Sequence, residues 1–76
     1  MTRRRSQKRY RVTYATFNTK GSQGLPKAWM NTNDEDEAEY AAQILNMLPN
    51  VHGSYVYDRD KQIIVINYGQ EITDHA

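Results

Sequence analysis

The segment from Asn33 to Leu48, NDEDEAEYAAQILNML, is the one stretch of the chain with the period of an amphipathic helix. At roughly 100° per residue, its polar and apolar side chains separate onto opposite sides of a helix. The polar side carries Glu35, Asp36, Glu39, Gln43 and Asn46, and the apolar side carries Ala38, Ala41, Ile44, Leu45 and Leu48. We therefore predict one helix with one buried stripe and one stripe in contact with water.

Capping residues mark both ends of this predicted helix. Thr32 and Glu35 have the spacing of a capping box, and Asn33 is an alternative N-cap. Residues 34–37 are all acidic, which suits the first turn because the helix dipole favours negative charge there. Pro49 cannot continue the backbone hydrogen bonding, so we expect the helix to end at Leu48.

Four segments rich in β-branched and aromatic residues predict strands, at residues 10–18, 25–31, 55–58 and 62–68. Glycines make residues 20–24 a turn, residues 50–54 are expected to be a loop, and residues 59–61 close a hairpin. The run from Ile63 to Ile66 is apolar on both faces, which is typical of a central strand. The predicted fold is a small α+β domain of order ββαββ, with one amphipathic helix packed on one face of a mostly antiparallel sheet.

A chain of 76 residues has room for one small core. We expect a disordered basic arm at residues 1–8, a single domain at residues 9–70 and a frayed tail at residues 71–76. No cysteine is present, which is compatible with a reducing compartment, and no segment approaches the ~20 apolar residues of a membrane span. We therefore expect a cytoplasmic protein with no membrane contact.

Positive charge is concentrated at the beginning of the chain. Residues 12–76 contain four lysines and arginines against nine acidic residues, a net charge of −5. Residues 1–11 contain no acid and six basic residues, which are Arg3, Arg4, Arg5, Lys8, Arg9 and Arg11. Such an arm suits contact with the phosphates of a nucleic acid, since each neutralised phosphate releases counterions. The alternative is a solubilising tail that partly neutralises an acidic body.

The predicted strands carry apolar or aromatic residues on both faces, and a single helix covers only one face. We expect the open face to bind a partner, through Phe17, Trp29, Tyr55, Tyr57 and Val65. Which sheet face carries Trp29, Tyr55 and Tyr57 stays open, and for Trp29 a one-residue bulge in the second strand would reverse the face. The cover could be a second copy of the chain, which would give a homodimer, a different protein, or stacked nucleobases. Internal packing of the aromatic rings is the alternative to all three.

The acidic start of the helix suggests a second partner-binding surface. Asp34, Glu35, Asp36 and Glu39 could imitate a row of phosphates and occupy a basic groove on another protein. The alternative is ordinary capping and complementation of the helix dipole.

No residue pattern indicates catalysis. The chain has no cysteine nucleophile, and His52 and His75 do not have the spacing of metal ligands. Asp58 and Asp60 lie in a predicted turn, where we expect both carboxylates to face water. We therefore expect no enzymatic activity, no metal and no cofactor.

No motif identifies a specific family. The predicted layout with its acidic helix start is similar to that of many small phage and mobile-element proteins, a likeness of architecture that implies no site. The sequence predicts a small non-catalytic binding module, a regulator or inhibitor that docks on a protein partner, with a nucleic-acid enzyme as one such partner. The alternative is a nucleic-acid-binding protein that uses the basic arm and the aromatic sheet face.

Overall fold

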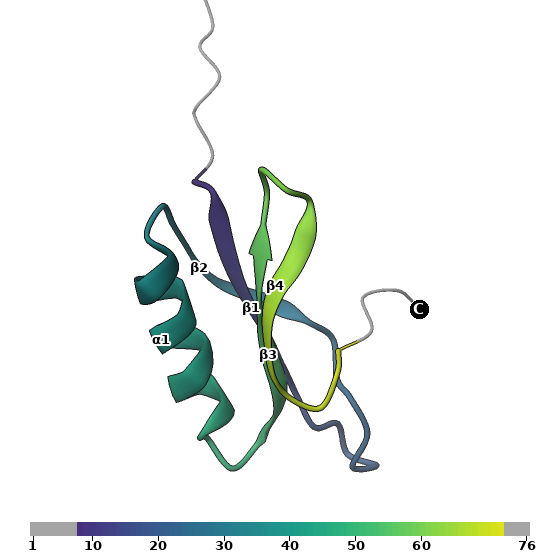
Figure 1. The fold of residues 1–76 in the computed structure, drawn as a ribbon. Helices are drawn as coiled ribbons and strands as arrows, with labels where there is room; N and C mark the ends of the chain where they lie inside the picture. Colours follow the sequence, from purple (N-terminus) through teal and green to yellow (C-terminus); the bar gives the residue numbers. More distant parts are fainter. Residues whose placement is uncertain (1–7, 73–76) are drawn as a thin grey trace, which may run out of the picture.

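The computed structural model describes residues 8–72, in which one helix packs on one face of a four-stranded antiparallel sheet (Figure 1). The elements in chain order are β1 (Tyr10–Thr16), β2 (Lys27–Thr32), α1 (Glu35–Asn46), β3 (Val51–Asp58) and β4 (Ile63–Gly69). The strands lie in the order β2-β1-β3-β4, and each neighbouring pair is antiparallel. This arrangement confirms the predicted α+β class and the ββαββ order.

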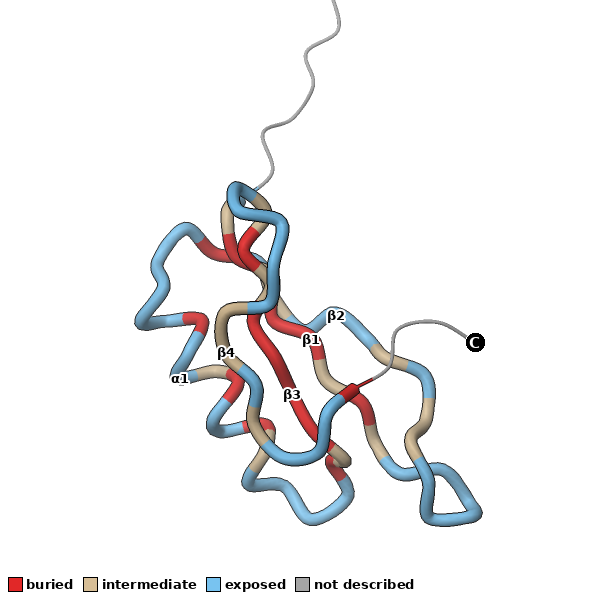
Figure 2. The backbone as a smooth tube through the Cα atoms, turned by 45° about the vertical axis from the view of Figure 1, so that its right-hand side comes forward, coloured by how far each residue is buried: buried red, intermediate tan, exposed pale blue. Residues whose placement is uncertain are grey.

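The central strands are β1 and β3, and β4 lies at an edge of the sheet. Figure 2 shows the buried residues concentrated along these two central strands. The prediction that the run from Ile63 to Ile66 forms a central strand is wrong, because β3 inserts between β4 and β1. Ile63 and Ile64 are exposed as a result.

Strand β3 begins at Val51, inside the segment that we expected to be a loop. Gly53 pairs with Ala15 on one side and with Gly69 on the other. A Cβ atom at Gly53 would collide with the backbone carbonyl oxygen of Gln70. Gly53 therefore marks a close approach of two backbones within the sheet rather than a loop.

Asp34 is the N-cap of α1, in place of the two residues predicted for that role. Its carboxylate accepts hydrogen bonds from the backbone amides of Asp36 at 2.9 Å and Glu37 at 3.3 Å. Asn33 instead accepts a hydrogen bond from the backbone amide of Arg9, at 2.8 Å. The helix ends at Asn46, two residues before the predicted end.

The buried stripe of α1 consists of Ala38, Ala42 and Leu45. Ile44 and Leu48, predicted to be buried, are 42% and 46% exposed. The small alanine side chains let the helix approach the sheet closely, and the Ser54 hydroxyl donates to the carbonyl oxygen of Ala42 at 2.6 Å. The helix is therefore rotated relative to the orientation that its hydrophobic pattern indicates.

Each face of the sheet has its own apolar cluster. The cluster on the helix side contains Tyr10, Val12, Ala38, Ala42, Leu45 and Val56. The cluster on the opposite face contains Ala15, Tyr55 and Ile72. The buried Ile72 belongs to the segment that we expected to be frayed, whose last four residues lie outside the described part of the chain. One end of the open face is thus covered by the chain itself.

Candidate binding surfaces

The residues of the predicted basic arm have different surroundings. Arg3, Arg4 and Arg5 lie outside the described residues, and Lys8 is exposed. The guanidinium group of Arg11 lies over the ring of Tyr57, 5.2 Å from its centroid. Arg11 therefore lies on the face of the sheet rather than in an extended arm.

Arg9 forms an ion pair with Asp58. Its Nε and Nη2 atoms donate to the two carboxylate oxygens of Asp58 at 2.9 and 3.0 Å. The backbone amides of Asp60 and Lys61 donate to the same carboxylate at 2.9 and 3.3 Å. This pairing joins the start of β1 to the turn between β3 and β4. Two of the donor atoms of Arg9 therefore stabilise the fold and are not available to a nucleic-acid phosphate.

The Asp58 carboxylate is buried, contrary to the expectation that it faces water. Asp58 is 1% exposed, and its hydrogen bond with Arg9 is the main cause that lowers its pKa to about 2. The two backbone amides lower this pKa further, against the opposing effect of burial. The same hydrogen bond raises the pKa of Arg9 above its ordinary value.

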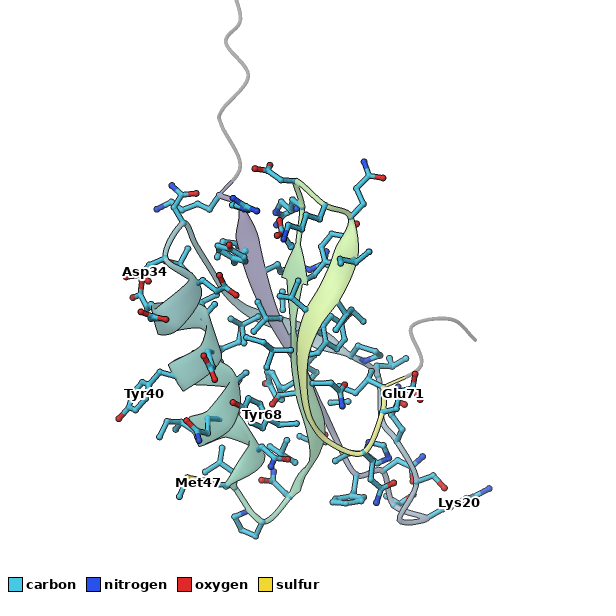
Figure 3. All side chains as sticks on the ribbon, viewed as in Figure 1. Lys20, Asp34, Tyr40, Met47, Tyr68 and Glu71 are labelled. Atoms are coloured by element: carbon cyan, nitrogen blue, oxygen red, sulfur yellow. The ribbon has the colours of Figure 1, made fainter. Side chains whose placement is uncertain are left out.

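Several acidic residues at the start of the helix accept hydrogen bonds within the domain, whereas Asp36 is exposed. Asp34 caps the helix, and Glu35 accepts from the hydroxyl of Tyr10 at 3.4 Å. Glu39 accepts from the hydroxyl of Tyr68 at 3.1 Å, and Figure 3 shows the Tyr68 side chain directed from the sheet toward the helix. Burial raises the pKa of Tyr68, and the hydrogen bond to Glu39 raises it further. These contacts attach the first half of α1 to the sheet.

The remaining predicted aromatic residues do not form one exposed face. Tyr55 is buried beneath Ile72, and Tyr57 is partly covered by Arg11. Phe17 is partly exposed at the end of β1, where its ring packs edge-to-face against His52 at 5.3 Å between centroids.

A β-bulge places Trp29 on the helix side of the sheet. Val12 pairs with Met30 and Thr13 pairs with Ala28, so Trp29 is the extra residue of β2. The Trp29 ring packs edge-to-face against Tyr14, with 6.1 Å between centroids, and Tyr14 packs against the helix-side cluster.

A second bulge, in β4, has the same effect on Val65. Val56 pairs with Ile66 and Tyr57 pairs with Ile64, which leaves Val65 as the extra residue. Val65 packs against the helix-side cluster, so the expectation that it lies on the open face is wrong.

Two hydrogen bonds define the rotation of α1 on the sheet. Glu37 accepts from Thr32 of β2 at 2.6 Å, so this flank of the helix faces β2. Glu39, bonded to Tyr68, lies on the flank that faces β4. At roughly 100° per residue, Ile44 falls on the same flank as Glu37. The exposed part of Ile44 is therefore directed toward β2.

Large apolar side chains are exposed on this flank and on the outer side of α1. Trp29 of β2 is 57% exposed, and Ile44 and Leu48 are 42% and 46% exposed. Tyr40 and Met47 point away from the sheet (Figure 3). We name these five residues the helix–β2 surface: Trp29, Tyr40, Ile44, Met47 and Leu48.

A pocket of about 320 Å³ lies on the sheet face opposite α1. It is lined by Arg11, Thr13, Pro26, Ala28 and Tyr55. Side chains alternate between the two faces of a strand, so Arg11 and Thr13, two residues apart, are expected on the same face from the sequence. We name this site the sheet-face pocket. No local sequence signal indicates that Pro26 and Ala28 line this face, because the bulge at Trp29 sets their register.

Within residues 8–72, no group of three or more histidine, aspartate or glutamate side chains is arranged to hold a metal ion. The helix of the described part of the chain is too short and too polar to cross a membrane. Comparisons with protein-family models, with curated protein sequences and with solved structures found no match to this chain. The fold and its surfaces therefore define a small α+β domain.

Proposed function

We propose that the protein is a non-catalytic binding module, a regulator or inhibitor that docks on a protein partner. The observation that carries this proposal is the helix–β2 surface, in which five large apolar side chains of α1, its C-terminal end and β2 are exposed. Contiguous exposed apolar surface is typical of sites that bind other proteins. Trp29 and Tyr40 are of the residue types that contribute most to such interfaces.

The edge strand β2 is the centre of the proposed interface. The bulge places Trp29 on one side of this strand, and Ala28 lines the pocket on the other side. A bulge disturbs the backbone ladder of an edge strand, and Pro26 has no amide hydrogen to donate. Recognition therefore depends on side chains on both sides of β2 rather than on addition of a strand.

A capture experiment with matched variants tests this function. The full chain is tagged in its own cells, and proteins that co-purify with the wild type, Ile44→Glu and Leu25→Glu are quantified by mass spectrometry. Leu25 is a suitable control because it is exposed and apolar but lies outside the helix–β2 surface. We expect Ile44→Glu to lose its main partner at least tenfold, since a charge would be buried in the interface, and Leu25→Glu to retain it.

Equal capture by all three forms would contradict the proposal. Sedimentation velocity of the purified chain distinguishes a second copy from a different protein. A dimer that Ile44→Glu converts to monomer would make the second copy the partner.

A second candidate function is binding of nucleic acid, favoured by the position of Arg11 over Tyr57. The turn between β3 and β4, which contains Lys61, lies beside the start of β1, since the Arg59 amide donates to the carbonyl of Arg9 at 2.8 Å. A cation beside a partly exposed ring suits a single strand, whose bases stack and whose phosphates need positive charge.

Fluorescence anisotropy with single-stranded and duplex oligonucleotides, at low and physiological salt, tests this candidate. Single-strand binding that persists at physiological salt and is lost in Arg11→Gln would support it. Binding that depends only on residues 1–8 and disappears with salt would contradict it, because that is the behaviour of any basic tail.

We also propose that the protein acts in the cytoplasm, because a chain without cysteine does not depend on an oxidising compartment. Fractionation of cells that express the tagged chain checks this. Recovery in a membrane or exported fraction would contradict it.

A further inference from the structure

The sheet-face pocket contains polar atoms that the domain itself leaves without partners. Thr13 is only 4% exposed, and its Oγ1 atom is buried with no hydrogen-bond partner. The Nε atom of Arg11 is also buried with no partner. Both residues line the same pocket. Buried donors are almost always paired in native proteins, so two unpaired donors in one pocket indicate a missing acceptor.

The Arg11 guanidinium contacts an aromatic ring and has no acidic partner in the described part of the chain. This guanidinium lies over the Tyr57 ring, 5.2 Å from the centroid, a contact that favours the planar group of arginine. Within residues 8–72 it forms no ion pair, whereas Arg9 is paired with Asp58. The charge of Arg11 is thus available to an external anion.

The walls of the pocket indicate the kind of anion. Among the described residues that line it, Arg11 supplies the one positive charge, and the others are Thr13, Pro26, Ala28 and Tyr55. A single charge suits a singly charged carboxylate, and the guanidinium fork matches its two oxygens. A phosphate with two negative charges would leave one charge without a cation. The methyl group of Ala28 and the ring of Pro26 suit the short apolar stem of an acidic side chain.

We propose that the sheet-face pocket binds the side-chain carboxylate of an aspartate or glutamate that the protein partner presents. Arg11 donates to the carboxylate through its guanidinium, and Thr13 donates through its hydroxyl. The proposal rests on the proposed function, because it requires a protein partner. It adds a charged contact on the side of β2 opposite Trp29.

A titration of the full-length, nitrogen-15-labelled chain with small probes tests the pocket. The probe is N-acetyl-glutamate amide, which carries one side-chain carboxylate, and its neutral isostere N-acetyl-glutamine amide is the control. Spectra report the Nε–H group of Arg11 and the backbone amide of Thr13. We expect saturable shifts of both signals with the glutamate probe and no shifts with the glutamine probe.

Three variants test the two proposed donors and the effect of losing a positive charge elsewhere. Arg11→Gln and Thr13→Val are each expected to lower the affinity for the glutamate probe by roughly tenfold, because each removes one hydrogen-bond donor to the charged carboxylate. Lys27→Gln is the matched control for lost charge, since Lys27 pairs with Tyr14 and lies outside the pocket lining. We expect Lys27→Gln to bind the probe as the wild type does.

Three results would overturn the proposal. Equal shifts with the glutamine probe would show that the carboxylate is not recognised. Stronger binding of inorganic phosphate at equal ionic strength would assign the pocket to phosphate. Roughly tenfold tighter probe binding after removal of residues 73–76 would make Asp74 of this chain the occupant, in place of a partner.

The probe titration and the capture experiment fail independently. If the glutamate probe binds but Ile44→Glu captures the partner as the wild type does, the proposed function is contradicted and only an anion-binding pocket remains. Lost capture by Ile44→Glu combined with no probe binding would remove only the pocket. If the partner docks through the helix–β2 surface and also presents a carboxylate to the pocket, Arg11→Gln must lower capture of the partner as well.

Discussion

Gly69 illustrates how a single residue can be fixed by its surroundings. Its φ is +77°, a conformation that residues with a Cβ atom rarely adopt. A Cβ atom at this position would collide with the side-chain oxygen of Asn46 and lie 3.0 Å from the carbonyl oxygen of His52. The end of β4 therefore requires glycine for both its dihedral angles and its close packing.

Gly21 provides a control for this requirement, because its φ is +82° but no atom lies within 4 Å of the added Cβ. We expect Gly21→Ala to lower the free energy of unfolding by about 1 kcal/mol, from backbone strain alone. Gly69→Ala should lower it by a further 1–3 kcal/mol or so, because of the collisions. Urea denaturation of both variants measures the difference. Equal losses would contradict the packing at Gly69.

Asp58 should make the stability of the domain depend on pH. Its pKa is lowered from 3.8 to about 2 in the folded protein, so its charged form stabilises the fold at pH values above about 4. This contribution is lost as the pH falls toward 2, because the carboxylate becomes protonated. We expect Asp58→Asn to be less stable than the wild type at pH 7, with the difference narrowing between pH 4 and pH 2.

Asp60→Asn is the matched control for that experiment. The Asp60 carboxylate is exposed and lies 3.5 Å from the Nε atom of Arg9. We expect a smaller loss of stability, since exposed ion pairs contribute little. Denaturant midpoints measured at several pH values compare the two variants. A difference in stability between wild type and Asp58→Asn that is constant from pH 7 to pH 2 would contradict the ion pair between Arg9 and the buried Asp58 carboxylate.

At the scale of the elements, the sequence predicted the type and order of every strand and of the helix, because hydrophobic period and turn residues are local signals. It did not predict the rotation of α1, since two alanines face the sheet while Ile44, a larger apolar residue, is 42% exposed on the flank toward β2. Nor could it predict the bulges at Trp29 and Val65, which arise from pairing between strands.

The rotation of α1 is tested by two neighbouring substitutions. Leu45 is 4% exposed in the helix-side cluster, so Leu45→Ala should lower the free energy of unfolding by about 2–5 kcal/mol. Ile44→Ala should cost about 1 kcal/mol or less, because surface substitutions have small effects. Chemical denaturation gives both values. If Ile44→Ala lowers the free energy of unfolding more than Leu45→Ala does, the helix has the orientation that the hydrophobic pattern indicates and the observed rotation is contradicted.

At the scale of the whole molecule, both candidate surfaces meet at β2. The sequence placed the candidate site on the open sheet face and on the acidic start of the helix. In the structure, Ile72 covers part of that face, and Glu35 and Glu39 bond to tyrosines of the sheet. Contacts between residues far apart in the chain produce no local pattern in the sequence, so the sequence did not predict them. The residues of the helix–β2 surface instead lie on α1, just after its end and on β2, and further exposed apolar residues lie at Phe17, Leu25, Ile63 and Ile64.

Trp29 reports directly on docking through the helix–β2 surface, because it is the only tryptophan of the chain and belongs to that surface. The measurement is the emission of Trp29, and its quenching by acrylamide, before and after the chain binds the captured partner, using a partner variant without tryptophan. We predict a shift of the emission to shorter wavelength and weaker quenching, since the ring leaves water. A complex that forms with unchanged emission and quenching would contradict docking through the helix–β2 surface.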